Sequence, residues 1–251
     1  MKLKLAAGTI ILASSAFVAQ GALVAEYNFE EGSGTTAVDS SGNSLNGVIN
    51  GGATWVSGFN GGTALNLDGV DDFVALHANT FAGMGSTVSI SAWVLGGPSN
   101  PKRSTFFWGA QNADGTGRQL QVHLPWENGQ AYWRAPGGQV GVVLTAAQTS
   151  GTWNHWAFTK ESSTGAIKIY ANGVEIAGGT NSTNTFSVAQ GYLGIDPNDV
   201  ARAYEGAIDD FKVYNHELSL SEVQALAGVP EPSSVLLTGL AALGFVGRRR
   251  R

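Results

Sequence analysis

The 251-residue chain has a formal net charge of −5 and contains no cysteine, which excludes a disulfide framework and a thiolate metal site. Six of its 14 Lys and Arg residues and one of its 19 acidic residues lie in the two terminal segments, which leaves 8 basic against 18 acidic residues, a formal charge of −10, in the rest of the chain. Such a body repels nucleic acid and anionic membrane surfaces. We therefore expect no nucleic-acid partner, whereas calcium and neutral glycans are ligands compatible with this negative charge.

Residues 1–22 have the order of parts found in a secretory signal peptide. Lys2 and Lys4 precede an apolar run at 5–18, and Ala19 and Gly21 follow as small residues. The alternative is a membrane anchor, but the run is shorter than the roughly 18 residues that a spanning helix needs. We expect cleavage after Gly21 or Ala22, followed by a single domain over residues 23–228.

The body of the chain shows the period of two that a half-buried strand imposes. Apolar and polar residues alternate in four segments, at 87–95, 118–124, 153–160 and 166–171. Further short strands are expected at 23–29, 64–68, 72–76, 104–110, 131–134, 191–195 and 207–215. Many short strands separated by turn residues predict an all-β fold, a two-sheet antiparallel jelly-roll sandwich.

One helix is expected in this body, and it lies near its end. Ser219 and Glu222 have the S-x-x-E spacing of a capping box, and Gly228 stands where a helix stop belongs. The sequence therefore predicts a short helix between them.

Five segments of the body carry a family resemblance, at 27–49, 64–76, 89–94, 153–173 and 206–226. Together and in this order they resemble laminin G-like domains of the concanavalin A-like lectin and glucanase superfamily. The resemblance covers nearly all of residues 23–228 and implies a jelly roll. It leaves the function open, because this superfamily includes lectins, adhesion modules, spacers and glycosidases.

The motifs of an enzyme of this superfamily are missing. Retaining glycoside hydrolysis needs two carboxylates about 5 to 5.5 Å apart, and the E-x-D-x-x-E pattern of laminarinase-type members does not occur. Glu127 has no acidic partner within ten residues on either side. A histidine base would need a nucleophile to activate, and the G-x-S-x-G motif of a serine nucleophile does not occur. We expect a protein without catalytic activity.

The acidic residues of the last long strand are the first candidates for a metal site. In the related folds an acidic residue at this place helps to hold a structural calcium, a role that the resemblance implies for Asp209, beside Asp210. Asp39 and Asn43 are further candidates from the first loop. The alternative for Asp209 is surface ion pairing. The alternative for Asp39 and Asn43 is a simple turn, which is favoured over a role as metal ligands.

A second acidic group contains Asp68, Asp71 and Asp72. Its spacing is not that of an EF-hand loop. An Asp-Gly pair between apolar stretches is typical of a hairpin. A tight hairpin corner is therefore favoured over a metal site.

The segment at 117–138 holds the candidates for ligand binding. Sugars stack on aromatic rings and accept contacts from amide and guanidinium groups, so an aromatic surface with a few polar groups suits them. The candidates are Gln119, Gln121, His123, Trp126, Trp133 and Arg134. His155 and Tyr170 would complete this surface if their strands shared the same sheet. The alternative is that the aromatic residues pack in the core, and the sequence alone does not decide between these two interpretations.

Residues 229–251 form a separate unit, in which an apolar stretch at 233–247 is predicted to be a transmembrane helix. A Pro-Glu-Pro tripeptide, this helix and a terminal arginine cluster resemble the PEP-CTERM sorting signal of Gram-negative bacteria. The residues concerned are Pro230, Glu231, Pro232, Arg248, Arg249, Arg250 and Arg251. The resemblance implies an exosortase-type enzyme that cuts near the tripeptide. Arginines held on the cytoplasmic side would anchor the chain transiently in the inner membrane, and the alternative is an ordinary anchor that is retained.

These observations predict an exported, non-catalytic module at the cell surface or in the extracellular matrix. We expect it to bind carbohydrate, such as an exopolysaccharide, and to contain a structural calcium ion. The alternatives are a structural or adhesion protein that binds other proteins and, less favoured, a glycoside hydrolase or lyase.

Overall fold

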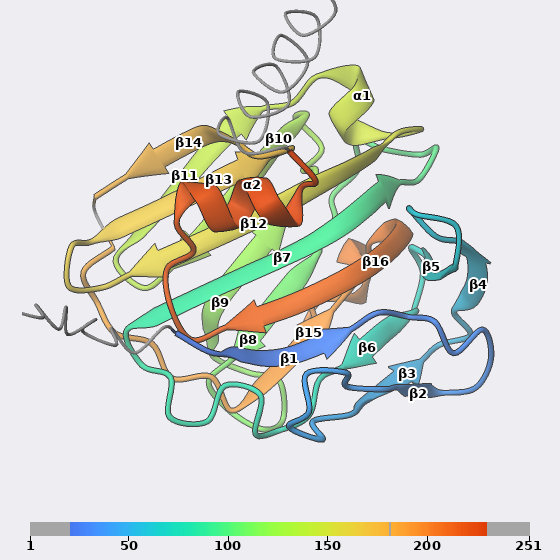
Figure 1. Ribbon diagram of the computed structural model, residues 1–251, viewed down its shortest axis with the longest axis horizontal. Coiled ribbons are helices and arrows are strands. Elements are labelled where there is room, and N and C mark those ends of the chain that lie inside the picture. Colours follow the sequence, from blue (N-terminus) through green and yellow to red (C-terminus); the bar gives the residue numbers. More distant parts are fainter. Residues whose placement is uncertain (1–20, 181, 230–251) are drawn as a thin grey trace, which may run out of the picture.

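The computed structural model describes residues 21–180 and 182–229, which form two antiparallel sheets packed face to face (Figure 1). The expected signal peptide at 1–22, apart from its last two residues, and the expected sorting signal from Pro230 onward lie outside the described residues. The all-β, two-sheet architecture predicted from the sequence is confirmed.

Sheet A is the layer nearer the viewer in Figure 1. Its strands follow the order β14-β13-β12-β7-β16-β5-β4, and β1 pairs with β16 beside this path. They are β1 (Leu23–Tyr27), β4 (Thr54–Ser57), β5 (Thr63–Asp68), β7 (Thr87–Gly96), β12 (Trp153–Glu161), β13 (Ala166–Ala171), β14 (Val174–Gly179) and β16 (Glu205–Tyr214).

Sheet B lies behind sheet A in the same view, with the order β11-β10-β9-β8-β15-β6-β3-β2. Its strands are β2 (Thr36–Ala37), β3 (Gly47–Asn50), β6 (Phe73–Ala75), β8 (Phe107–Ala110), β9 (Arg118–His123), β10 (Gln130–Ala135), β11 (Gly138–Val143) and β15 (Gln190–Leu193).

Within the described residues three short helical segments accompany the sheets, namely α1 (Ala146–Thr149), the 3-10 turn η1 (Val200–Arg202) and α2 (Leu220–Leu226). The predicted capping box of α2 is confirmed, because the Ser219 side chain accepts from the Glu222 N–H while the Glu222 carboxylate accepts from the Ser219 N–H. Leu218 and Val223 pack on Ala157 and Tyr170, so α2 covers the outer face of sheet A (Figure 1). In the segments that the structure describes, no helix is both long enough and apolar enough to cross a membrane.

The core lies between the two sheets and is filled by the inward face of each strand. In β7 and β12, for example, Ile90, Trp156 and Phe158 point inward and are fully or almost fully buried. Trp133 of β10 is 0% exposed, and its indole Nε1 donates to the Thr159 carbonyl of sheet A over 2.8 Å. This bond joins the two sheets across the core and satisfies a polar atom that burial would otherwise leave unpaired.

Two local features follow directly from residue type. Asn172 and Gly173 both have positive φ values, 50° and 80°, and they form the two-residue turn between β13 and β14 that the Asn-Gly pair predicts. In β16 the register shifts between Asp209 and Lys212, and Asp210 there has a φ of 49°. This bulge lets Asp209 and Phe211 point to opposite faces of the sheet although only one residue separates them.

The predicted hairpin at 68–72 is wrong in one respect. The segment does turn sharply, but β5 before it belongs to sheet A and β6 after it belongs to sheet B. The two strands therefore do not pair with each other. The corner instead carries the chain from one sheet to the other.

Replacement of Trp133 by alanine is expected to lower the free energy of unfolding by about 3 to 5 kcal/mol, because it opens a large cavity and removes the bond to sheet A. Denaturant unfolding measures this change. Val143→Ala is the matched control, since Val143 of the neighbouring strand β11 is 71% exposed and a surface truncation of this kind changes stability by only about 0.5 kcal/mol. Equal effects of the two substitutions would contradict the placement of Trp133 in the core.

Candidate functional site

The outer face of sheet B, turned away from the core, gathers arginines and aromatic rings around β9 and β10. We call it the arginine-aromatic face. Its members are Arg103, Arg118, Gln121, His123, Trp126, Tyr132, Arg134 and Arg202.

The pairing of β9 with β10 places the central side chains of this face. Tyr132 lies opposite His123, and Arg134 lies opposite Gln121. The residues between them, such as Val122 and Trp133, point into the core. The two strands therefore build the core and the outer face with alternate residues.

Trp126 lies in the turn between β9 and β10, where its N–H donates to the Gln130 carbonyl over 2.8 Å. Its side chain is half-buried. The His123 ring is centred 4.3 Å from it, and the guanidinium carbons of Arg103 and Arg202 lie 5.2 and 5.5 Å from its ring centre. These distances are those of cation-π contacts, so Trp126 holds two arginines at the edge of the face.

A pocket of about 470 Å³ opens at the end of β9 and β10 that lies away from Trp126. It is lined by Arg118, Gln119 and Arg134 and by residues 135–139, which run from the end of β10 into β11. Arg118 also donates from Nη1 to the Gln121 carbonyl oxygen Oε1 over 3.2 Å. The volume falls within the range of small-ligand pockets, and the lining is polar and cationic.

His123 lies beneath this surface and is 1% exposed. Its Nδ1 donates to the Ser104 carbonyl over 2.6 Å, which fixes the tautomer. Burial, and secondarily the charges of Arg134, Arg202 and Arg118, lower its pKa to about 4. The ring is therefore neutral at neutral pH and serves as a support for Trp126.

The sequence-predicted ligand residues do not all reach the surface. Gln119 and Arg134 line the pocket, and Trp126 is half-buried at its turn. Gln121 and His123 point to the same side but are covered. Trp133 belongs to the core and offers no surface to a ligand, so its inclusion was wrong: neighbours in a strand point to opposite faces.

His155 and Tyr170 do not extend this surface. They lie on β12 and β13 of sheet A, whereas β9 and β10 belong to sheet B, so the condition for their participation is not met. The sequence analysis in turn missed Arg103, Arg118 and Arg202. Of these, only Arg118 lies in a segment that the sequence analysis named as a strand, at 118–124. Arg103 and Arg202 reach the face from segments that are distant in the sequence.

Asp209 is buried on the outer face of sheet A, where its Oδ2 accepts from the Phe59 N–H over 2.9 Å. Burial, and secondarily the charges of Asp210 and Glu30, raise the pKa of Asp209. Asp210 instead pairs with Lys212, with an N–O distance of 3.7 Å. Asp209 has no ion pair among the described residues.

Asp39 and Asn43 hold the first loop. The Asp39 carboxylate accepts from the N–H groups of Glu26, Ser41 and Leu45 and from the Ser41 hydroxyl, at 2.8 to 3.0 Å. These bonds outweigh its burial and lower the pKa of Asp39. The Asn43 amide donates to the Leu23 and Val24 carbonyls. The turn interpretation therefore accounts for the contacts of both residues.

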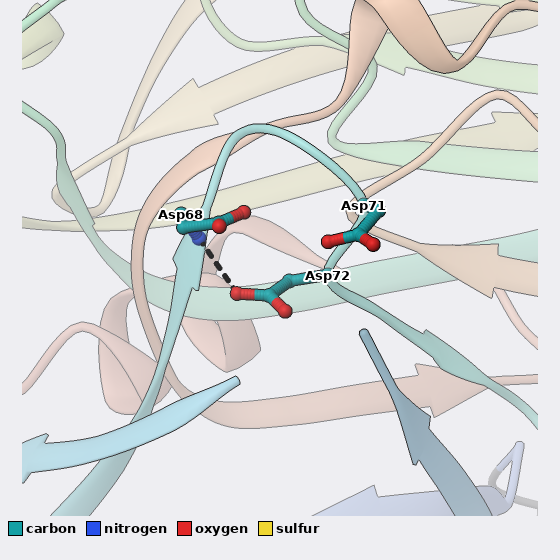
Figure 2. A group of neighbouring side chains, drawn as sticks. All are labelled: Asp68, Asp71 and Asp72. Carbon is teal, nitrogen blue, oxygen red and sulfur yellow. Dashed lines mark hydrogen bonds between the residues drawn. The ribbon is translucent and has the colours of Figure 1, made fainter. Parts of the chain in front are cut away.

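Asp68, Asp71 and Asp72 bring their carboxylates together at the corner between the sheets (Figure 2). A carboxylate oxygen from each lies within 4.8 Å of the others. In the described part of the chain, no other group of three His, Cys, Asp or Glu side chains brings its ligand atoms this close together. Asp72 is buried and accepts from the Asp68 N–H over 2.9 Å. Burial and the charges of its two neighbours raise the pKa of Asp72.

Two antiparallel sheets packed face to face define an all-β sandwich module with a jelly-roll-like architecture. The chain belongs to the concanavalin A-like lectin/glucanases superfamily, whose laminin G profile matches residues 68–224. Residues 228–251 match the PEP-CTERM protein-sorting motif. This motif implies exosortase processing and export to the cell surface or the extracellular space.

Solved structures share the fold. Domain 4 of AbnA, an extracellular arabinanase of Geobacillus stearothermophilus in complex with arabinotriose, is 25% identical, with a TM-score of 0.63 over 82% of this chain and 98% of that chain. The binding domain of botulinum neurotoxin serotype G is 15% identical, with a TM-score of 0.63 over 82% and 51%. Trypanosoma rangeli sialidase in complex with the inhibitor DANA is 15% identical, with a TM-score of 0.62 over 82% and 32%.

The chain thus spans about half of the neurotoxin domain and a third of the sialidase, which show the fold alone. Comparison with curated protein sequences gave no match.

The two buried histidines are expected to make stability depend on pH. His123 and His155 both have a pKa lowered to about 4, chiefly by burial. Between about pH 6.5 and pH 4 the unfolded chain binds protons that the folded domain does not, so the free energy of unfolding falls as the pH falls through this window. At about 1.4 kcal/mol per pKa unit, each histidine accounts for up to about 3 kcal/mol.

Denaturant unfolding at several pH values checks this dependence. His123→Gln and His155→Gln should each remove about half of the loss between neutral pH and the acid end of the window, whatever they do to stability at pH 7. A variant that keeps the full loss would show that its histidine is not the group responsible.

Proposed function

We propose that the module binds carbohydrate without transforming it and that the pocket of the arginine-aromatic face is the binding site. The observation that carries this proposal is the pocket of about 470 Å³ in which Arg118, Gln119 and Arg134 converge. Guanidinium and amide groups donate to adjacent sugar hydroxyls in pairs. The guanidinium carbon of Arg134 lies 5.6 Å from the ring centre of the half-buried Tyr132. This ring, with that of Trp126 farther along the same face, supplies apolar surface for a sugar face.

The likeness to domain 4 of the arabinanase supports the same proposal. That domain was solved with arabinotriose, and this chain covers 98% of it. The likeness therefore covers nearly the whole of a domain that was solved with a bound sugar.

The chemistry of the face favours binding over catalysis. Glycoside hydrolysis in most families needs two carboxylates about 5 to 9.5 Å apart. The titratable members of the arginine-aromatic face are arginines, a tyrosine and a histidine, and the nearby Asp196 and Asp199 are paired with Arg202. We therefore infer a non-catalytic module. Release of reducing ends from polysaccharide would contradict it.

The sorting motif supports a place for this binding outside the cell. We infer passage through the inner membrane of a Gram-negative bacterium, transient anchoring there, and a role on surface glycan or exopolysaccharide. The alternative is a structural or adhesion module that binds other proteins, and glycan binding distinguishes the two because a module of that kind has no saturable sugar site.

Trp126→Ala is expected to weaken polysaccharide binding by about tenfold, since it removes a ring and releases the two arginines that pack on it. Affinity electrophoresis or calorimetry with arabinan and bacterial exopolysaccharides measures the change. The matched control is Trp153→Ala, which truncates a half-buried tryptophan of sheet A and should leave affinity unchanged. If both variants fold and bind as the unaltered protein does, the arginine-aromatic face is not the site.

We also propose that a structural calcium ion is held at Asp209. This carboxylate is buried, carries a raised pKa and feels the negative charges of Asp210 and Glu30, and a divalent cation would offset that repulsion. Asp39 and Asn43 are less suited as ligands, because one carboxylate accepts four hydrogen bonds and the other side chain acts as a donor.

Calcium is therefore expected to raise the melting temperature of metal-stripped protein, and Asp209→Asn is expected to abolish this rise. Asp72→Asn is the comparison, because it removes one charge from the carboxylate group at the corner between the sheets. Scanning calorimetry with calcium or chelator measures both. If only Asp72→Asn removes the calcium effect, the ion lies at the corner, and if calcium has no effect on any variant, the module has no such site.

A further inference from the structure

The arginines of the domain are confined to one face. Residues 21–229 contain four arginines and four lysines, and all four arginines belong to the arginine-aromatic face on sheet B. This concentration occurs on a domain in which acidic residues outnumber basic ones. The face is therefore a local positive region on a negative body.

The lysines, by contrast, already have partners. Lys102, Lys168 and Lys212 form ion pairs with Glu205, Glu217 and Glu26. Lys160 is buried, and its Nζ donates to the carbonyl and hydroxyl of Ser182. The ammonium groups of these lysines are thus ion-paired or hydrogen-bonded within the described fold.

Two arginines of the pocket lack such partners. Arg202 pairs with Asp196 and Asp199, but neither Arg118 nor Arg134 has a carboxylate within ion-pair distance in the part of the chain that the structure describes. Burial, and secondarily repulsion from Arg118, lower the pKa of Arg134. Two like charges are therefore held together in a pocket wall.

Two nitrogens next to this wall are also unsatisfied. The Nε of Arg134 and the Nε2 of Gln121 are buried and have no hydrogen-bond partner among the described residues. Buried donors without partners destabilise a fold, and so does repulsion between neighbouring guanidinium groups. An anion in the pocket relieves the repulsion and gives the guanidinium groups an acceptor.

We propose that this pocket selects an acidic saccharide and binds its carboxylate, as in a uronic acid residue, between Arg118 and Arg134. The planar guanidinium fork matches the two oxygens of a carboxylate, and Gln119 and Gln139 in the same lining supply amides for the adjacent hydroxyls. This inference rests on the proposed carbohydrate binding and adds the class of sugar. The positive face also explains how an acidic module approaches a polyanion that its body repels.

Calorimetry with the full-length protein would compare two short oligosaccharide probes that share the same sugar backbone. These are an oligogalacturonate and the same oligomer with its carboxylates methyl-esterified, with neutral arabino-oligosaccharide as a third probe. We expect the free acid to bind at least about tenfold more tightly than the ester, because one charge-assisted bidentate contact is worth about that factor. Its affinity should fall as salt rises.

Arg118→Gln and Arg134→Gln should each lower affinity for the free acid by about tenfold or more and lower affinity for the ester by a much smaller factor. Arg134→Lys keeps the charge but loses the fork, so it should recover only part of the loss. Lys168→Gln removes one positive charge from sheet A and is the control for net charge. The melting temperature of the two glutamine variants should stay equal or rise, since they remove repulsion.

The outcomes separate this inference from the proposed function. Equal or tighter binding of the ester or of the neutral probe overturns the acidic-sugar inference and leaves carbohydrate binding standing. Loss of affinity in Lys168→Gln equal to that in Arg134→Gln also overturns it, because net charge alone would then be responsible. Failure of all three probes overturns both the inference and the proposed function.

Discussion

The strict alternation of side chains along β9 and β10 is the constraint on which the rest of this structure depends. One set of side chains, with Trp133 at its centre, must fill the space between the sheets and bond to sheet A. The other set, with Arg134 next to it in the chain, must then face outward. Core and candidate site are thus two sides of the same two strands, and a one-residue slip would exchange them.

The features that the sequence analysis predicted correctly are those that short stretches of chain determine. The period of two in 87–95 and 153–160 identified two long central strands. The capping box at Ser219 depends on the chemistry of a few neighbouring residues. The superfamily and the sorting motif also followed from segments in a fixed order.

Other features depend on contacts between distant parts of the chain. Strands β11 and β14 escaped notice because their glycines and exposed valines blur the apolar pattern. The cluster of arginines joins residues 118 and 134 of two paired strands with residue 103 of a loop and residue 202 of η1, which no local pattern reveals. The misplacement of Trp133 was avoidable, since a strand cannot turn both Trp133 and Arg134 toward one ligand.

The position of α2 has a consequence for how the module is presented. This helix packs on the outer face of sheet A, and the described chain ends just after it, at residue 229. The first described strand, β1, also belongs to sheet A, where Asn215 and Ala22 join the two ends of the body by reciprocal bonds. The polypeptide therefore enters and leaves on one side of the sandwich, while the arginine-aromatic face occupies the opposite side. A long polymer that binds the arginine-aromatic face would therefore approach the module from the side opposite both ends of the described body.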